Sequence, residues 1–361
     1  MANRITGSTD TTGAISVRPK TEKSLLIVCE STATSDKATP EKIYTITGTS
    51  DAEARFGEKV GKLVKILINN GVDNIKCIAI DAYGEGEDSK YASVSEAYEG
   101  AMSASLGETS IKCVILDTTS PTAINALKTH LNFAEGEDIF RYGVIGSVAV
   151  DVDAAGTEAE GVNEKRIFMP FPYMVDNSNV KLDGIYGAAG LAALIMTETS
   201  DPALPMNGVE FVGFGGTNMH LLNAQKNTLE QKGITAIVGT STPAVWRLVT
   251  TRTKDASGEA DPIWHEGTTL FIADDVLSTV IDTLKATYKR TKNVTRVLDA
   301  IKTTVIGILE TKEALEIIEN FDKSTVTVIQ NPEDIYGALV DYEINVVTPL
   351  YTITINQHLK L

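Results

Sequence analysis

The stretch Ser-Leu-Leu-Ile-Val-Cys at residues 24–29 decides the fold class, because it is the first of several short and almost purely apolar runs. Similar runs lie at 75–80, 111–116 and 143–150, and they are rich in β-branched residues. Apolar runs of this length, without polar alternation, are typical of strands that are buried on both faces of a parallel sheet. The sequence therefore predicts four buried strands at these positions.

Helical patterns separate these runs. Ser-Asp-Ala-Glu at 50–53 has the form of a capping box, which predicts the start of a helix. Apolar residues at helical spacing continue to Asn70-Gly71, a typical C-cap signal. Further helices are predicted at 95–106, 121–133, 184–197 and 218–232. Because strands that alternate with helices are joined by right-handed crossovers, we expect an α/β domain with a mainly parallel sheet at 24–253.

A second domain is predicted after Lys-Asp-Ala-Ser-Gly-Glu-Ala-Asp-Pro at 254–262, a stretch typical of an interdomain linker. Apolar residues at helical spacing from Ile272 to Tyr288 then predict a long amphipathic helix. We expect a second helix at 294–308, a short one at 311–320 and a strand at 337–347. The sequence thus predicts a C-terminal α+β domain at 263–348.

Both ends of the chain depart from this pattern. Residues 1–23 are rich in Thr, Ser and Gly, and a short alternation at Ile15 and Val17 precedes Pro19, so we predict an extended arm. Residues 349–361 begin with Pro349 and then alternate with period 2, the apolar positions being Tyr351, Ile353, Ile355, Leu359 and Leu361. This alternation predicts a terminal strand that pairs either within its own domain or with the sheet edge of a neighbouring subunit.

Charge and cysteine content narrow the class of protein. The net charge of −16 argues against nucleic acid or an anionic membrane as the partner, because phosphate binding requires a basic surface. We find neither a membrane-spanning apolar stretch nor a signal peptide, and we therefore expect assembly in the cytosol. Cys29, Cys77 and Cys113 each lie in an apolar run, which predicts buried free thiols.

Three segments resemble ligand-binding motifs but are incomplete, so we expect no cofactor and no metal. Residues 57–63 imitate a phosphate-binding loop, but Leu63 stands where a Ser or Thr must reach Mg²⁺. Residues 213–216 begin like a dinucleotide-binding fingerprint, but the third glycine of that motif is missing. Residues 151–156 resemble the start of a calcium-binding loop. The twelfth position of such a loop must be Glu, and in this chain it is Val162.

The segment Gly-Thr-Ser-Thr-Pro at 239–243 resembles the serine segment of subtilases. A triad needs a histidine and an aspartate in matching segments upstream. His130 and His220 are followed by the wrong residues, and His265 lies after Ser241. The alternative that the chain is an α/β hydrolase or a nucleotide-binding enzyme is therefore disfavoured, and we predict a protein without an active site.

Several segments, in order, resemble the sheath proteins of contractile phage tails. These are Phe56-Gly57 followed by Asn70-Gly71, Ala-Gly-Leu at 189–191 followed by Pro-Met-Asn at 205–207, Leu229 to Gly233-Ile234 followed by Arg252-Thr253, and the closing segment from Asn331 to Leu361. The resemblance covers residues 24–361, although the region around Trp246 lacks the glycine of many members. The chain is most similar in length to the compact sheaths of simple phages and R-type bacteriocins.

The resemblance implies a structural subunit that polymerises helically around an inner tube and contracts to drive the tube through a bacterial envelope. The domain at 24–253 would be an outer domain of subtilisin-like topology without the triad, and 263–348 would form the inner domain together with the N-terminal arm. The partners would be further copies of the chain, the tube protein, and baseplate and tail-terminator proteins. Assembly would take place in the cytoplasm of the bacterial host, and the product would be a virion tail or a released tail-like particle.

The resemblance also implies roles for individual residues. Strand exchange between subunits would use Ile15, Val17, Tyr351, Ile353, Ile355, Leu359 and Leu361, with hinges at Pro19 and Pro349. Two charged stretches of the inner domain are candidates for contact with the tube, one basic from Lys285 to Lys292 and one acidic on the helix predicted at 311–320. We favour the acidic stretch, because Glu313, Glu316 and Glu319 would form one stripe on such a helix.

Overall fold

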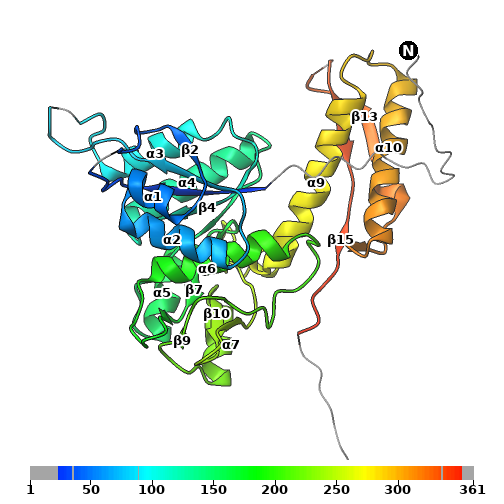
Figure 1. Cartoon of the computed structure of the whole chain (residues 1–361). Coiled ribbons are helices and arrows are strands. Elements are labelled where there is room, and N and C mark those ends of the chain that lie inside the picture. Colours follow the sequence, from blue (N-terminus) through cyan, green and yellow to red (C-terminus); the bar gives the residue numbers. More distant parts are fainter. Residues whose placement is uncertain (1–22, 35, 88, 335, 352–361) are drawn as a thin grey trace, which may run out of the picture. The chain divides into compact units, whose positions relative to one another are not determined.

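The computed structural model describes residues 23–34, 36–87, 89–334 and 336–351 (Figure 1). The contacts divide the chain into two compact units. The larger unit comprises Lys23–Ser278 and the segment that begins at Val346, and the smaller unit contains Thr279–Asn345. Each unit has its own core and is described separately.

A six-stranded sheet forms the centre of the larger unit. Its strands are β1 (Ser24–Cys29), β2 (Ile43–Ile46), β3 (Ile75–Ala79), β4 (Ile111–Leu116), β5 (Tyr142–Val144) and β6 (Ile167–Phe168), in the order β2-β3-β1-β4-β5-β6. All neighbours are parallel except β2, which is antiparallel to β3. The predicted α/β class with a mainly parallel sheet is therefore confirmed. The run at 143–150 is a strand only at its start.

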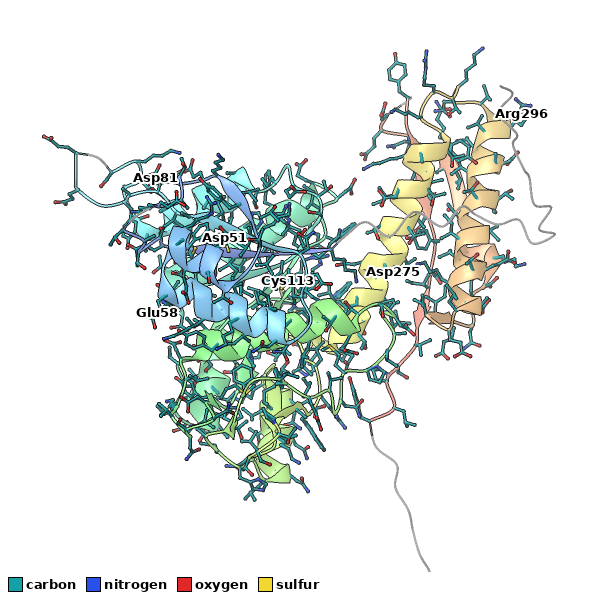
Figure 2. The ribbon with its side chains drawn as sticks, in the orientation of Figure 1. Asp51, Glu58, Asp81, Cys113, Asp275 and Arg296 are labelled. Carbon is teal, nitrogen blue, oxygen red and sulfur yellow. The ribbon has the colours of Figure 1, made fainter. Side chains whose placement is uncertain are left out.

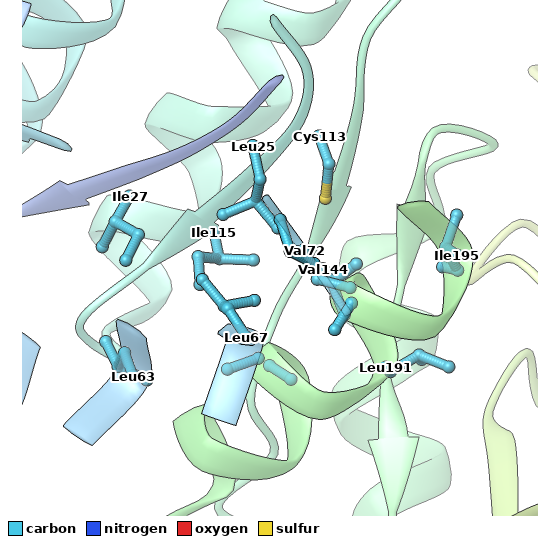
Figure 3. Packing of buried hydrophobic residues seen from close by; sticks show 14 of the residues in the cluster. Leu25, Ile27, Leu63, Leu67, Val72, Cys113, Ile115, Val144, Leu191 and Ile195 are labelled. Carbon is cyan, nitrogen blue, oxygen red and sulfur yellow. The ribbon is translucent and has the colours of Figure 1, made fainter. Parts of the chain in front are cut away.

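Helices cover both faces of this sheet. They are α1 (Thr49–Phe56), α2 (Glu58–Asn69), α3 (Val94–Ala104), α4 (Pro121–Gly136), α5 (Val152–Val162) and α6 (Gly184–Glu198). A further helix, α7 (Asn223–Gln231), packs against α5 and against the strand at 235–238. Side chains of β1 alternate between two cores, Leu25 and Ile27 entering one and Leu26 the other. Figure 3 shows the first core, with Leu63 of α2 and Leu191 of α6. The predicted burial of the three free cysteines is confirmed.

The prediction of a capping box at 50–53 is wrong. Helix α1 begins at Thr49, its N-cap is Gly48, and no side chain caps it. The Asp51 carboxylate instead accepts a hydrogen bond from the Thr47 amide at 3.2 Å, in the turn before the helix. The predicted C-terminal signal of α2 is confirmed, since Asn70 is the C-cap and Gly71 has a φ of 87°.

Short strands and a long helix complete the larger unit. The strands are β7 (Pro170–Phe171), β8 (Met174–Val175), β9 (Gly216–Thr217), β10 (Thr235–Val238) and β11 (Ala244–Val245), and a short helix α8 spans Pro262–His265. Helix α9 (Gly267–Thr287) begins in this unit. Asp274 of α9 accepts two hydrogen bonds from the buried Arg166 guanidinium, at 2.7 and 2.8 Å. These bonds hold the start of α9 against the rest of the larger unit.

The smaller unit consists of the end of α9, α10 (Thr295–Ala314), a 3₁₀ turn (Lys323–Thr325) and the short strands β12 (Ile318–Glu319), β13 (Thr327–Gln330) and β14 (Ala338–Asp341). The short strand β15 (Asn345–Val346) spans its boundary with the larger unit. Val280, Val305 and Leu309 are buried in its core. The separate helices predicted at 294–308 and 311–320 are wrong, because α10 is one helix that ends at Ala314. Helix α10 ends there because Glu316 has a φ of 58°, which turns Ile317 and Ile318 into the core.

The stretch predicted as a linker, 254–262, is locally ordered. Lys254 pairs with Ala260 in an isolated bridge, and the Asp255 carboxylate accepts hydrogen bonds from the amides of the turn. The contacts divide the chain further on, between Ser278 and Thr279. The predicted boundaries of the domains stay predictions.

Candidate assembly surface

The hairpin β13–β14 is the most exposed regular element of the smaller unit. Its antiparallel register pairs Val328 with Val340 and Ile329 with Leu339. Val328 and Val340 are half-buried, and β13 packs against α10. Ile329 and Leu339 are 51% and 46% exposed. One face of the hairpin is therefore covered by the chain itself, and the other presents an apolar pair to the surroundings.

The outer edges of this hairpin also bear on assembly. Within the described residues, β13 and β14 form a sheet of two strands only. Strands at the edge of a sheet present backbone N–H and C=O groups to which a further strand can pair. A sheet of two strands is marginally stable alone and gains from further strands. This geometry suits the addition of an extended segment at either edge.

A second feature lies where the C-terminal segment returns to the larger unit. Tyr351 Oη donates a hydrogen bond to Glu266 Oε1 at 2.7 Å, just before α9 begins. The Arg247 guanidinium lies over the Tyr351 ring, 4.5 Å from its centroid. Arg247 also forms an ion pair with Glu230 of α7. We call these four residues the Tyr351 clamp.

The clamp is a partly desolvated cluster. Burial raises the pKa of the Glu266 carboxyl, and burial together with the charge of Glu266 raises the pKa of Tyr351. The Tyr351 hydroxyl therefore keeps its proton and remains a donor. A hydrogen bond to a charged acceptor in such surroundings contributes about 1.5–3 kcal/mol. The clamp thus fixes the chain at Tyr351, immediately before residue 352.

Most residues predicted for strand exchange lie outside the described ranges: Ile15, Val17, Ile353, Ile355, Leu359 and Leu361, together with the hinge residue Pro19. Tyr351 is described, and it contacts its own chain through the clamp. Pro349 lies between strand β15 and Tyr351. The strand and the tyrosine each make contacts with their own chain. Sequence reasoning missed Arg247 and Glu266 because neither belongs to a recognisable motif.

The three carboxylates predicted to face the tube do not share a helix. Glu313 lies in the last turn of α10, where its carboxylate accepts a hydrogen bond from the Phe321 amide at 2.9 Å. Glu316 has the left-handed conformation after the helix, and Glu319 lies in β12. The helical stripe that motivated this prediction is therefore absent. Contact of these residues with a tube stays a prediction, and the helical arrangement no longer supports it.

The incomplete motifs adopt structures of other kinds. Residues 58–63 lie inside α2, and Lys62 forms an ion pair with Glu58 at 2.7 Å. Ser241 is exposed in the turn before β11. The buried His130 accepts a hydrogen bond from Arg141, and His265 Nδ1 donates a hydrogen bond to the Arg252 carbonyl at 2.9 Å.

The described residues contain no group of three or more His, Cys, Asp or Glu side chains arranged to hold a metal ion. Among the described helices, none combines the length and the apolar character that a membrane span requires.

Comparison with known proteins identifies the C-terminal part of the chain. Residues 259–360 match the family model of the phage tail sheath C-terminal domain. The match begins within the stretch predicted as a linker and includes the hairpin and the clamp tyrosine. No curated protein matches the sequence of the chain.

Solved structures resemble the whole chain. The helical sheath of the anti-feeding prophage in its contracted state has a TM-score of 0.70 at 14% identity, over 99% of this chain and 99% of that one. A sheath tail protein from Listeria innocua has a TM-score of 0.70 at 11% identity, over 91% and 93%. One from Desulfitobacterium hafniense has a TM-score of 0.65 at 11% identity, over 96% and 100%. The fold of the chain is the fold of these sheath proteins.

Proposed function

We propose that this chain, which has the fold of contractile sheath proteins and carries a phage tail sheath C-terminal domain, is itself the repeating subunit of a contractile sheath. The observation that carries the proposal is the match of residues 259–360 to that domain. The agreement in fold over nearly the full length with a helical sheath in its contracted state supports it. The subunit polymerises helically around an inner tube, and its contraction drives the tube through a bacterial envelope.

Strand addition at the hairpin β13–β14 links neighbouring subunits. The hairpin is the acceptor, and the alternating segment 352–361 of a neighbour is the donor. Each added strand contributes several backbone hydrogen bonds and buries side chains beside the exposed Ile329–Leu339 pair. The residues of the N-terminal arm, Ile15 and Val17, join the same sheet from another neighbour.

The partners are further copies of the chain, the inner tube protein, and the baseplate and tail-terminator proteins at the two ends of the sheath. The subunits assemble in the cytoplasm of the bacterial host. The protein performs no catalysis, because its work is done by a cooperative change of the lattice. Its net charge of −16 disfavours binding to nucleic acid or to anionic lipid.

Electron microscopy of the purified protein tests the proposal. We expect negative-stain images to show hollow tubes or stacked discs of uniform diameter when the protein is concentrated or mixed with its tube protein. Light scattering should rise with a concentration threshold, as for any cooperative polymer. Discrete particles of constant mass at every concentration, with and without the tube protein, would contradict the proposal.

A further inference from the structure

A surface pocket in the larger unit adjoins the Tyr351 clamp. It has a volume of about 470 Å³ and is lined by Asn223, Asn227, Glu230, Gln231, Trp246 and Arg247. This volume lies within the range of about 300–1,000 Å³ that is usual for binding pockets. Arg247 and Glu230 belong to the clamp as well as to the pocket. The segment that follows Tyr351 therefore starts at the edge of the pocket.

One wall of the pocket is a face of α7 that is rich in side-chain amides. Asn223, Asn227 and Gln231 follow one another at intervals of four residues, so they lie along one side of the helix. All three are exposed. Each amide can both donate and accept hydrogen bonds, as the backbone of an extended peptide does. A row of such amides is suited to bind a peptide main chain, whatever its side chains.

Trp246 supplies a second and independent sign of a missing partner. The Lys226 ammonium lies 4.0 Å from its ring centroid, which covers one face of the indole. The indole Nε1 is buried and has no acceptor within the described part of the chain. A buried donor without a partner costs about 1–3 kcal/mol. A carbonyl from a segment outside the described ranges would remove this cost.

We propose that residues 352–361 of the same chain bind in this pocket while the subunit is free. The clamp holds the start of this segment at Tyr351, so the effective concentration of the segment at the pocket is high. Ten extended residues reach about 33 Å, which exceeds the length of about 14 Å of the nine-residue helix α7. The segment can therefore pass along the whole row of amides.

This binding has a consequence that rests on the proposed function. A segment held on its own subunit is not available to the hairpin of a neighbour. Polymerisation then requires its release, which a growing sheath end would provide by offering a better acceptor. The pocket would thereby keep free subunits from polymerising away from the tube.

Cross-linking of the free subunit tests the proposal without reference to polymers. Asn227→Cys is combined with Thr354→Cys, and dilute protein is treated with a short bis-maleimide reagent. Cys29, Cys77 and Cys113 do not compete, because they are buried and burial raises the pKa of each thiol. The matched control pairs Thr354→Cys with Lys62→Cys on α2, which is exposed and which Figure 1 shows well apart from α7.

We expect an intramolecular product that is several-fold more abundant for the Asn227 pair than for the Lys62 pair. Equal yields, or products that join two chains only, would overturn the proposal, the second result assigning the pocket to another copy. The unfolding free energy gives a further measurement. Trp246→Phe should destabilise the full chain more than the chain that ends at Tyr351, and equal effects in both would also contradict the proposal. If the cross-link forms but no polymer does, the proposed function fails and this inference stands.

Discussion

His130 is a buried base that links folding to pH. It is 5% exposed, and Arg141 Nη1 lies 3.0 Å from its Nε2. Because a guanidinium only donates, Nε2 is the acceptor and the ring is neutral. Burial, together with the charge of Arg141, lowers the pKa of His130 to about 4. The unfolded chain takes up this proton near pH 6.5, so stability falls as the pH falls from about 6.5 to about 4, by up to about 3 kcal/mol.

His130→Gln should remove this part of the pH dependence, because the glutamine oxygen still accepts from Arg141 but does not titrate. The measurement is the free energy of unfolding in urea at several pH values between 4 and 7. The difference between the two proteins isolates His130 from the carboxylates that titrate below pH 5. An unchanged slope in the variant would show that the pKa of His130 is the same in the folded and the unfolded chain, which would contradict this account.

Loss of one partner from the buried ion pair between Arg166 and Asp274 should destabilise the larger unit strongly. Arg166 is 2% exposed, and its second partner is Glu135, at 2.9 Å. Asp274→Ala leaves the guanidinium with Glu135 and the Arg141 carbonyl, and we expect the free energy of unfolding to fall by about 3 kcal/mol. Chemical denaturation measures the loss. Lys62→Ala, which removes an exposed pair within one helix, is the control and should have no measurable effect.

At the scale of elements, the segment after the clamp should be needed for assembly but not for folding. Removing residues 352–361 leaves Tyr351 and every described contact in place. We expect a monomer with an unchanged circular dichroism spectrum that forms no polymer in sedimentation assays. A chain cut before Leu350 should also lose the clamp. Normal polymers from the shorter chains would refute strand donation by this segment.

Strands were predictable from the sequence where burial on both faces demanded apolar runs, as in β1 and β4. Local signals failed where packing decided the outcome: α10 ends at Ala314 because Ile317 and Ile318 are needed in the core. The clamp could not be predicted. Tyr351 fits the period-2 pattern of a strand, and Glu266 lies 85 positions away in the sequence. Contacts over such a distance follow from the fold and leave no local pattern.

At the scale of the whole molecule, the incomplete motifs should be irrelevant to function. Ser241 is exposed in a turn, and Lys62 lies inside a helix. Ser241→Ala and Lys62→Ala should therefore leave polymerisation and contraction unchanged, as measured by microscopy of tube-filled particles. Peptidase activity or ATP turnover that disappears in either variant would contradict a purely structural role.

The central claim is that subunits are joined by strands that pass from one chain to the hairpin of another. A cryo-electron microscopy reconstruction of the polymer tests it most directly, because residues 352–361 can be traced from the clamp at Tyr351 to their place of binding. We predict that they form a third strand on β13 or β14 of a neighbouring copy. Density that returns these residues to their own chain in the polymer, with both hairpin edges unpaired, would contradict the account.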